Sequence, residues 1–187
     1  MNYLKVIKNY IPYNEQEEKE KEQILQYSRL TPDLLTRDNT IAHFTASSVV
    51  VNESRDKILM VYHNIWQDWC WTGGHVDGEE DFLKVAIRET KEETGVKKVI
   101  ALGDTPIALD IVPAWGHYKN GKYVVSHQHL NLTYLLQVDE GEILHKKEDE
   151  NQGVMWIPIK DYKQYVKQKS MYPIYDKIIE KMINNRI

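Results

Sequence analysis

Three glutamates with helical spacing are the residues of this sequence best suited to chemistry. Glu89, Glu92 and Glu93 fall in the segment FLKVAIRETKEETGV, which begins at Phe82. Residues three and four apart are neighbours on a helix, so the three carboxylates would share one small surface. Mg²⁺ and Mn²⁺ prefer hard oxygen ligands of this kind. The spacing therefore predicts a divalent-cation site on one face of a helix.

The helix that would carry these carboxylates has recognisable ends and a core-facing side. Asp81 is suited to the N-cap, and Gly95 to the position just after the last turn. The spacing i, i+3, i+4, i+7 predicts a stripe facing the core, formed by Leu83, Ala86, Ile87 and Thr90. Glu92 and Glu93 then lie in the last turn, where carboxylates oppose the helix dipole by about 0.3–1 kcal/mol each. Selection for stability alone would not place them there.

An ordinary solvated helix is the alternative interpretation of this segment. Arg88 would then pair with Glu92 four residues on, as in many charged surface helices. That interpretation leaves the like charges at the unfavourable end of the helix unexplained. A bound divalent cation would instead make their proximity favourable.

The wider stretch from Gly74 to Val96, GHVDGEEDFLKVAIRETKEETGV, resembles the signature of the Nudix hydrolases. That signature is G-x5-E-x7-R-E-U-x-E-E-x-G-U, where U is a bulky apolar residue. The residues that match it in register are Gly74, Glu80, Arg88, Glu89, Glu92, Glu93, Gly95 and Val96. Thr90 departs from it, because the family usually has Ile, Leu or Val there. This departure lies on the core stripe, so it concerns packing more than the acidic face.

The resemblance implies a metal-dependent hydrolase that cleaves a diphosphate linkage in a nucleoside diphosphate joined to another group, such as a nucleoside triphosphate, a dinucleotide or a sugar nucleotide. It implies Mg²⁺ or Mn²⁺ as the cofactor, held by Glu89, Glu93, Glu92 and the carbonyl of Gly74. Arg88 would orient Glu89 through a charge-assisted hydrogen bond. Glu80 would brace the loop before the helix or join the metal cluster. Which carboxylate is the general base varies within the family, and this choice stays open.

Residues outside the signature supply further candidates. Asp149 and Glu150 precede the apolar run VMWI, where family members often have another acidic residue, and Glu150 is the one we favour for catalysis. A solvated polar loop explains both residues equally well. Cys70, between two tryptophans, is expected to be a strand residue and not a catalytic thiol.

Histidines and tryptophans are the candidates for substrate binding. His127 and His129 alternate along an expected strand, so they share one side of it with Asn131 and Thr133. His75 follows the Gly73-Gly74 pair, which we expect to form a tight turn beside the metal. These histidines have no recognisable zinc-ligand spacing, and hydrogen-bonded sheet residues would look the same. The tryptophans that could stack on a base are Trp69, Trp71 and Trp115, although tryptophans on strands more often lie in the core.

The composition fits a single globular domain with an addition at its start. The chain has 187 residues, a net charge of −4 and one cysteine, which argues against a nucleic-acid surface and suits a reducing compartment. No membrane-spanning apolar run or signal peptide is evident, so the expected location is the cytoplasm. We divide the chain into a helical extension over residues 1–40, which offers a surface for a homodimer, and a Nudix domain over residues 41–187.

The expected elements form a mixed sheet flanked by helices. Strands are predicted over residues 43–51, 57–63, 69–72, 97–102, 107–118, 123–138 and 154–158. The first two should form a hairpin, and the Asn-Gly pair at 120–121 should join the two long strands. Helices are predicted from Asn14, with Glu17 completing a capping box, from Thr31 for one turn, and over residues 82–94, 159–168 and 172–185. The resemblance implies the same α+β class, an α/β/α sandwich with a loop-helix-loop motif, over residues 42 to about 160.

Two other functions remain as alternatives. A non-catalytic Nudix-like module would bind a nucleotide or sugar nucleotide as a sensor, but loss of signature glutamates would favour that function and this chain keeps them. An isomerase of prenyl diphosphates uses a related fold and relies on a catalytic cysteine, for which the setting of Cys70 is unsuited.

Overall fold

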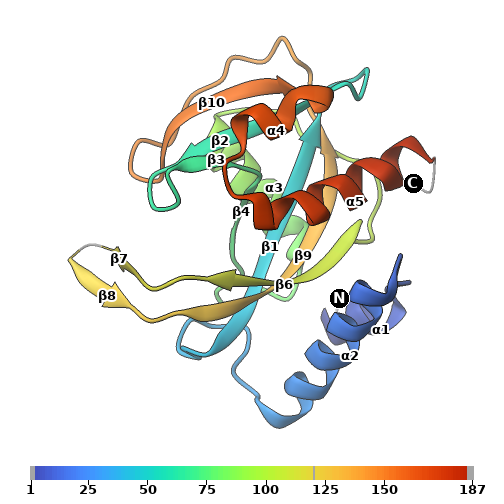
Figure 1. The fold of residues 1–187 in the computed structure, drawn as a ribbon, viewed down its shortest axis with the longest axis vertical. Coiled ribbons are helices and arrows are strands. Elements are labelled where there is room, and N and C mark those ends of the chain that lie inside the picture. Colours follow the sequence, from blue (N-terminus) through green and yellow to red (C-terminus); the bar gives the residue numbers. More distant parts are fainter. Residues whose placement is uncertain (1–2, 120, 185–187) are drawn as a thin grey trace.

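The computed structural model describes residues 3–119 and 121–184, and a curved mixed sheet forms its centre (Figure 1). β1 (Ala42–Val51) and β9 (His127–Gln137) pair in parallel, from Ala42 beside Gln128 to Val51 beside Gln137. The sheet continues on both sides in the order β10 (Asn151–Pro158), β2 (Lys57–His63), β1, β9, β5 (Ile100–Ala101). Shorter strands extend it: β3 (Asp68–Cys70) on β2, β4 (Thr72–His75) on β1 and β6 (Ala108–Ala114) on β9.

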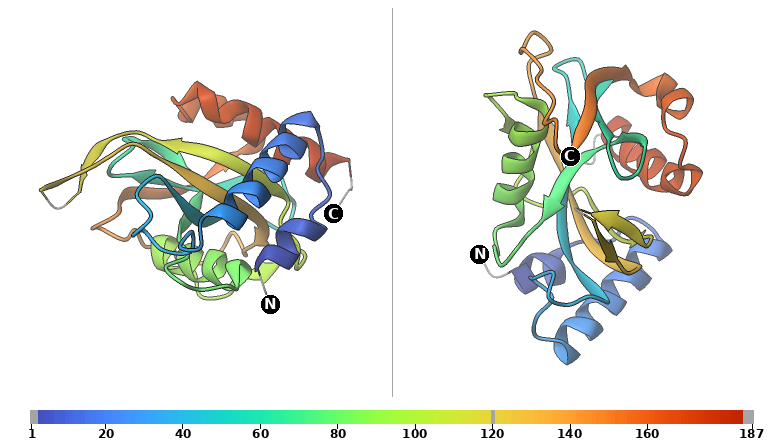
Figure 2. Two further views of the ribbon diagram at one scale, coloured as in Figure 1. Left: turned by 90° about the horizontal axis from the view of Figure 1, so that it is seen from below. Right: turned by 90° about the vertical axis from the view of Figure 1, so that its left-hand side faces the viewer.

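Helices cover both faces of this sheet (Figure 2). α3 (Phe82–Thr94) packs on one face, where Phe44, Ala46 and Val50 of β1 join Val85 and Ala86 in a buried cluster. The other face carries α4 (Tyr162–Tyr165), α5 (Tyr172–Ile183) and two 3₁₀ turns, η1 (Ile159–Asp161) and η2 (Lys169–Met171). The side chains in that second cluster include Val49, Val51, Tyr175 and Ile178. β1 is therefore buried on both faces.

The N-terminal helices α1 (Tyr3–Asn9) and α2 (Glu15–Leu30) pack into the same core. Ile7 and Ile24 are fully buried and belong to the cluster that contains α3. The backbone N–H of Ile111 in β6 donates to Glu20 of α2 at 2.6 Å. α1 was not expected from the sequence, since its seven residues form only two turns.

The mixed sheet flanked by helices is confirmed, as are the β1–β2 hairpin and the start of α2. The Asn14 side chain caps α2 by accepting from the N–H of Glu17 at 3.0 Å. The Glu17 carboxylate does not complete the predicted box, because it accepts instead from the N–H of Tyr13 at 2.7 Å and from other buried groups. The helical turn predicted from Thr31 was wrong, since residues 32–35 form a plain turn.

The two long strands predicted over residues 107–118 and 123–138 are each interrupted. β6 pairs with β9 only as far as Ala114 opposite His127. Beyond this point β7 (His117–Lys119) and β8 (Lys122–Val124) form a separate two-stranded arm. The break falls at Gly116, whose N–H bonds to the Ser126 hydroxyl at 2.8 Å and not to a strand partner. Asn120, half of the predicted turn, lies outside the described residues.

Other boundaries differ by a few residues. The strand predicted over residues 97–102 is reduced to β5, and β10 begins three residues earlier than predicted. The helix predicted over residues 159–168 is shortened to η1 and α4. α5 ends at Ile183, and the predicted end at Asn185 lies outside the described residues. Within the described residues, no helix combines the length and apolar character that crossing a membrane requires.

Candidate functional site

The ends of α3 are those that the sequence predicts. Asp81 is the N-cap, and its side chain accepts from the N–H of Lys84 at 3.1 Å. Gly95 closes the helix in the left-handed conformation at φ 76° and bonds to the carbonyl of Lys91 at 2.9 Å. These caps fix the length of the helix, and with it the turn on which each glutamate lies.

The core-facing side of α3 is rotated from the predicted stripe. Ala86 and Thr90 are buried as expected, but Leu83 and Ile87 are only partly buried. The other buried residues of the helix are Phe82, Val85, Glu93 and Thr94. The helix therefore turns the Glu93 carboxylate into the protein, and this side chain is only 3% exposed.

Thr90, the departure from the signature, lies in a buried cluster of hydroxyl groups. Its Oγ1 is 2.6 Å from the Oγ of Ser48 on β1 and 3.0 Å from the Oγ1 of Thr72 on β4. It also donates to the carbonyl of Ala86 at 2.8 Å. Ser48 and Thr72 are themselves 2.7 Å apart, and all three side chains are fully buried. These hydrogen bonds satisfy a polar group at a position where an apolar one is usual.

Glu93 is the most buried of the three glutamates on α3. One of its carboxylate oxygens accepts from the N–H of Gly73 at 3.0 Å. Burial raises the pKa of this carboxyl well above its usual value, and the nearby charges of Glu89 and Glu150 raise it further. A positive charge close to Glu93 would stabilise its ionised form.

Glu89 is held by a charged neighbour. Arg88 donates to its Oε1 at 2.8 Å and lies 3.8 Å from Glu92. Burial raises the pKa of the Glu89 carboxyl, an effect that Arg88 opposes and that Glu92 adds to. Arg88 thus contacts the Glu89 carboxylate directly, and its orienting role stays a prediction.

The loop before β10 brings two further charged groups to this face. Lys147 lies 3.3 Å from Glu92 and 3.1 Å from Glu150. Asn151, the first residue of β10, donates from its buried side chain to the carbonyl of Glu93 at 3.1 Å. Glu150 therefore lies with the signature glutamates, although 57 residues separate it from Glu93 in the sequence.

The Gly73-Gly74 pair lies in β4 and not in a tight turn, so that prediction was wrong. Close packing explains the glycines. A Cβ on Gly73 would lie 2.5 Å from the Ser47 hydroxyl, and one on Gly74 would lie 2.7 Å from Cδ of Glu89. Any larger residue at either position would push away β1 or the glutamate.

A cavity of about 1040 Å³ opens over this face. The predicted site residues that line it are Gly74, His75, Glu89, Glu92, Glu93, His127, His129 and Glu150, with Trp69 and Trp71. Arg88, Glu80 and Trp115 do not line the cavity as the described residues form it, and Trp115 is 63% exposed. Cys70 lines it from β3, where burial raises the pKa of its thiol to about 12, so it is held as a neutral thiol.

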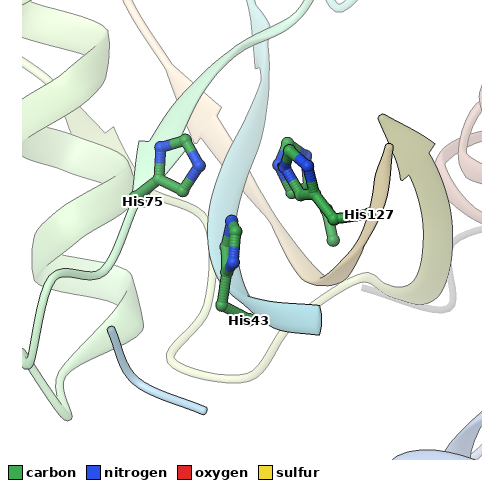
Figure 3. A group of neighbouring side chains, drawn as sticks. His43, His75 and His127 are labelled. Atoms are coloured by element: carbon green, nitrogen blue, oxygen red, sulfur yellow. The ribbon is translucent and has the colours of Figure 1, made fainter. Parts of the chain in front are cut away.

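Histidines form a second group of side chains in the same cavity (Figure 3). His75, His127 and His129 were predicted to contact substrate, and the structure brings them together with His43 of β1. Each of the four rings offers one nitrogen, and these nitrogens all lie within 4.8 Å of one another. His43 carried no recognisable signal in the sequence, because its place in the group depends on the pairing of β1 with β9.

Comparison with known proteins decides the family of this chain. The family model of the NUDIX domain matches residues 42–182. The chain belongs to the NUDIX family. This match continues through α4 and into α5, past the end near residue 160 expected from the sequence. α1 and α2 precede it.

Two curated relatives are named as hydrolases. The chain is 34% identical over 116 residues to the "Probable DHNTP pyrophosphohydrolase" of Lactococcus lactis subsp. cremoris (strain MG1363), a match that covers 61% of this chain and 60% of that protein. It is 45% identical over 56 residues, 28% of this chain and 27% of that protein, to the CMP-5'-(N-acetyl-N-hydroxy-3-aminopropyl)phosphonate hydrolase of Streptomyces rubellomurinus (strain ATCC 31215). The matches thus span less than two thirds of either relative.

A solved hydrolase structure has the same fold. An Ap4A hydrolase of C. elegans superposes with a TM-score of 0.54 at 20% identity, covering 75% of this chain and 98% of that one. The mixed sheet between helices described above is therefore the Nudix fold. In this chain, α3 and the strand before it carry the Nudix signature at the edge of the cavity.

Proposed function

We propose that this chain is a divalent-metal-dependent hydrolase that cleaves a diphosphate linkage in a nucleotide-type substrate. The observation that carries this proposal is the gathering of carboxylates from two distant segments at one cavity: Glu89, Glu92 and Glu93 on α3 and Glu150 before β10. Burial and mutual repulsion raise the pKa values of Glu89 and Glu93. Hard oxygen donors of this kind fit Mg²⁺ or Mn²⁺, which would relieve that repulsion.

The roles that we propose follow the signature. Glu89, Glu93, Glu92 and the Gly74 carbonyl would hold the cation, which when bound supplies positive charge to neutralise phosphoryl oxygens. Arg88 keeps the Glu89 carboxylate oriented through the bond at 2.8 Å. Glu150 or Glu92 would accept a proton from the attacking water. Lys147 contacts both carboxylates and so limits how each is oriented. Glu80 is exposed, and we assign it to bracing the loop before α3.

The substrate class follows from the shape of the cavity and from the relatives. About 1040 Å³ accommodates a nucleotide-sized molecule, and the tryptophans Trp66, Trp69 and Trp71 at its wall offer surfaces for a planar ring. The relatives are named for DHNTP, for Ap4A and for a CMP-linked phosphonate. We propose a substrate of this kind, with a ring system joined to a chain of phosphates.

The single cysteine suits the reducing cytoplasm, where we propose that the enzyme acts. A homodimer through the N-terminal helices stays a prediction.

Product release from a substrate panel tests this proposal. The panel contains nucleoside triphosphates, Ap4A, DHNTP and sugar nucleotides, each with Mg²⁺, with Mn²⁺ and with a chelator. We expect metal-dependent turnover of at least one compound and none with chelator. Nucleotide binding without turnover of any compound would overturn the proposal in favour of the non-catalytic sensor module.

A further inference from the structure

Four histidines meet on one face of three neighbouring strands, beside the glutamate face. In the parallel β1–β9 pair, His43 lies directly opposite His129. His127 precedes His129 by two residues on β9 and therefore faces the same side. His75 on β4 lies opposite Thr45, which is two residues from His43 on β1. The strand register alone thus aims all four side chains into one space. Figure 3 shows three of them, His43, His75 and His127.

The rings are close enough to share one ion. The centroids of His43 and His127 are 4.7 Å apart, and those of His75 and His129 are 5.1 Å apart. The Nε2 atoms of His127 and His129 are separated by 3.0 Å. Nitrogens around a tetrahedral zinc ion, each about 2.0–2.1 Å from it, stand about 3.3 Å apart. The four nitrogens now lie within 4.8 Å of one another, so the rings would have to draw closer together around an ion.

Two of the rings are oriented as metal ligands usually are. The Nδ1 of His43 is 2.8 Å from the carbonyl of Asn39, and the Nδ1 of His127 is 2.8 Å from the carbonyl of Val125. Because a carbonyl only accepts, each Nδ1 carries the proton, and each Nε2 keeps its lone pair. This outer hydrogen bond is the arrangement that fixes the tautomer of metal-binding histidines.

One of these lone pairs has no partner. The Nε2 of His43 is buried and makes no hydrogen bond within the described residues, and the His43 side chain is only 4% exposed. Burying a polar atom without a hydrogen-bond partner destabilises the fold. An ion at the centre of the four rings would supply the missing partner.

We propose that His43, His75, His127 and His129 form a binding site for a transition-metal ion of the zinc type, distinct from the Mg²⁺ site of the glutamates. Imidazole nitrogen suits zinc and its neighbours, whereas Mg²⁺ requires oxygen. The site stands whether or not the chain hydrolyses a diphosphate, because it uses none of the signature carboxylates.

The location of the site also suggests its use. The four rings line the same cavity as the glutamates. An ion there would fix β4, β1 and β9 together at the floor of the cavity and add positive charge where an anionic substrate enters. The histidines would then act on substrate through the ion, in place of the direct contact predicted from the sequence.

Zinc binding by the metal-free wild-type protein is the first test. The chain is treated with chelator, loaded with Zn²⁺, passed through a desalting column and analysed for metal. We expect one zinc per chain, and Co²⁺ in its place should give the intense visible absorption of tetrahedral coordination. X-ray absorption of the zinc-loaded wild type should show four imidazole nitrogens at about 2.0–2.1 Å. No retained zinc, or a shell made mainly of oxygen, would overturn the proposal.

Variants then separate the two sites. Loss of an outer hydrogen-bonding partner weakens metal binding about 10- to 100-fold. His43→Gln removes a ligand itself, so it should weaken zinc binding by more than this. His145→Gln, which changes an exposed histidine, and Glu89→Gln, which changes the other site, should keep wild-type affinity for zinc. Loss of zinc in Glu89→Gln with retention in His43→Gln would show that the ion occupies the glutamates and would refute the four-histidine site. The absorption spectrum of the wild type decides the matter even if His43→Gln does not fold.

Discussion

At the scale of single residues, Thr90 shows how one position of the signature can change while the protein keeps its fold. The hydroxyls of Ser48 and Thr72 lie within hydrogen-bond distance of Thr90, so the polar group is introduced together with its partners. The sequence shows the departure at Thr90 but not the compensation, because Ser48 is 42 residues away. A buried polar network of this kind is stable only while every member is satisfied.

Replacing Thr90 with the family-like residue should therefore destabilise this protein. Thr90→Val keeps the size of the side chain but leaves Ser48 and Thr72 with fewer partners. We expect a loss of about 1 kcal/mol in the free energy of unfolding, measured by urea denaturation. Adding Ser48→Ala should cost less in the Thr90→Val background than in the wild type, by at least about 0.5 kcal/mol. Strictly additive losses would show that the hydroxyls do not interact.

His63 provides a prediction for pH dependence. Burial lowers the pKa of His63 to about 4, with smaller contributions from nearby charges. Its Nδ1 accepts from the N–H of Ile65 at 3.1 Å, which requires the neutral ring. The unfolded chain binds a proton near pH 6.5 and the folded chain does not, so His63 favours folding above pH 6.5 and this advantage is lost as the pH falls toward 4.

A comparison with His63→Gln isolates this effect from the other titrating groups. At pH 7 the variant should be less stable, because it loses the acceptor for Ile65. Between pH 6.5 and 4 the wild type should lose up to about 1.4 kcal/mol per pH unit relative to the variant. Urea midpoints measured across this range should therefore converge. A gap that stays constant with pH would contradict the lowered pKa.

At the scale of elements, a buried charge network joins the first helices to the last. Glu17 of α2 is fully buried and lies 3.0 Å from Lys177 and 2.8 Å from Lys181 of α5. Lys177 also contacts Asp110 of β6 at 2.5 Å. Burial raises the pKa of Glu17, but Lys177 and Lys181 outweigh this effect, so the net pKa is lowered and Glu17 is ionised. α2 is thus tied to the domain by charge as well as by apolar packing.

Removing one member of this network should be costly. Glu17→Ala leaves two buried lysines without their shared carboxylate, and we expect a loss of about 3–5 kcal/mol in the free energy of unfolding. Glu18→Ala is the matched control, since Glu18 is exposed on the next position of α2, and it should stay within about 0.5 kcal/mol of the wild type. Equal effects of the two substitutions would show that α2 is an appendage and not part of the core.

The same helix shows where prediction from sequence reaches its limit. The cap at Asn14 and the helical spacing are local, so the start of α2 was correctly predicted. In the run EQEEKEKEQ, however, Glu17 is one acidic residue among several, and only contact with α5, about 160 residues later, makes it different. The caps of α3 are also local, so they were correctly predicted. The rotation that buries Glu93 was not predicted, because it depends on contacts with β4 and β10.

At the scale of the whole molecule, the sheet lies between α3 on one face and α4 with α5 on the other (Figure 2). The cavity opens over α3 and the ends of β1, β4 and β9. The layers and the glutamate face could be predicted, since periodicity and the signature are written in contiguous residues. The four-histidine group could not. It depends on the register of two parallel strands, and His43 and His129 are 86 residues apart in the chain.

The most direct test of the central claim compares turnover by Glu93→Gln with that by Glu79→Gln. Glu79 lies in the loop before α3 and pairs with Lys84 at 2.8 Å, away from the cavity, so its substitution makes the same chemical change outside the site. In metal-free buffer Glu93→Gln should be as stable as the wild type or slightly more stable, because it removes a buried carboxylate whose pKa is strongly raised. With Mg²⁺ and a hydrolysed substrate, we predict at least a roughly 100-fold loss of kcat in Glu93→Gln and little change in Glu79→Gln. A folded Glu93→Gln variant that keeps wild-type, metal-dependent turnover would contradict the account.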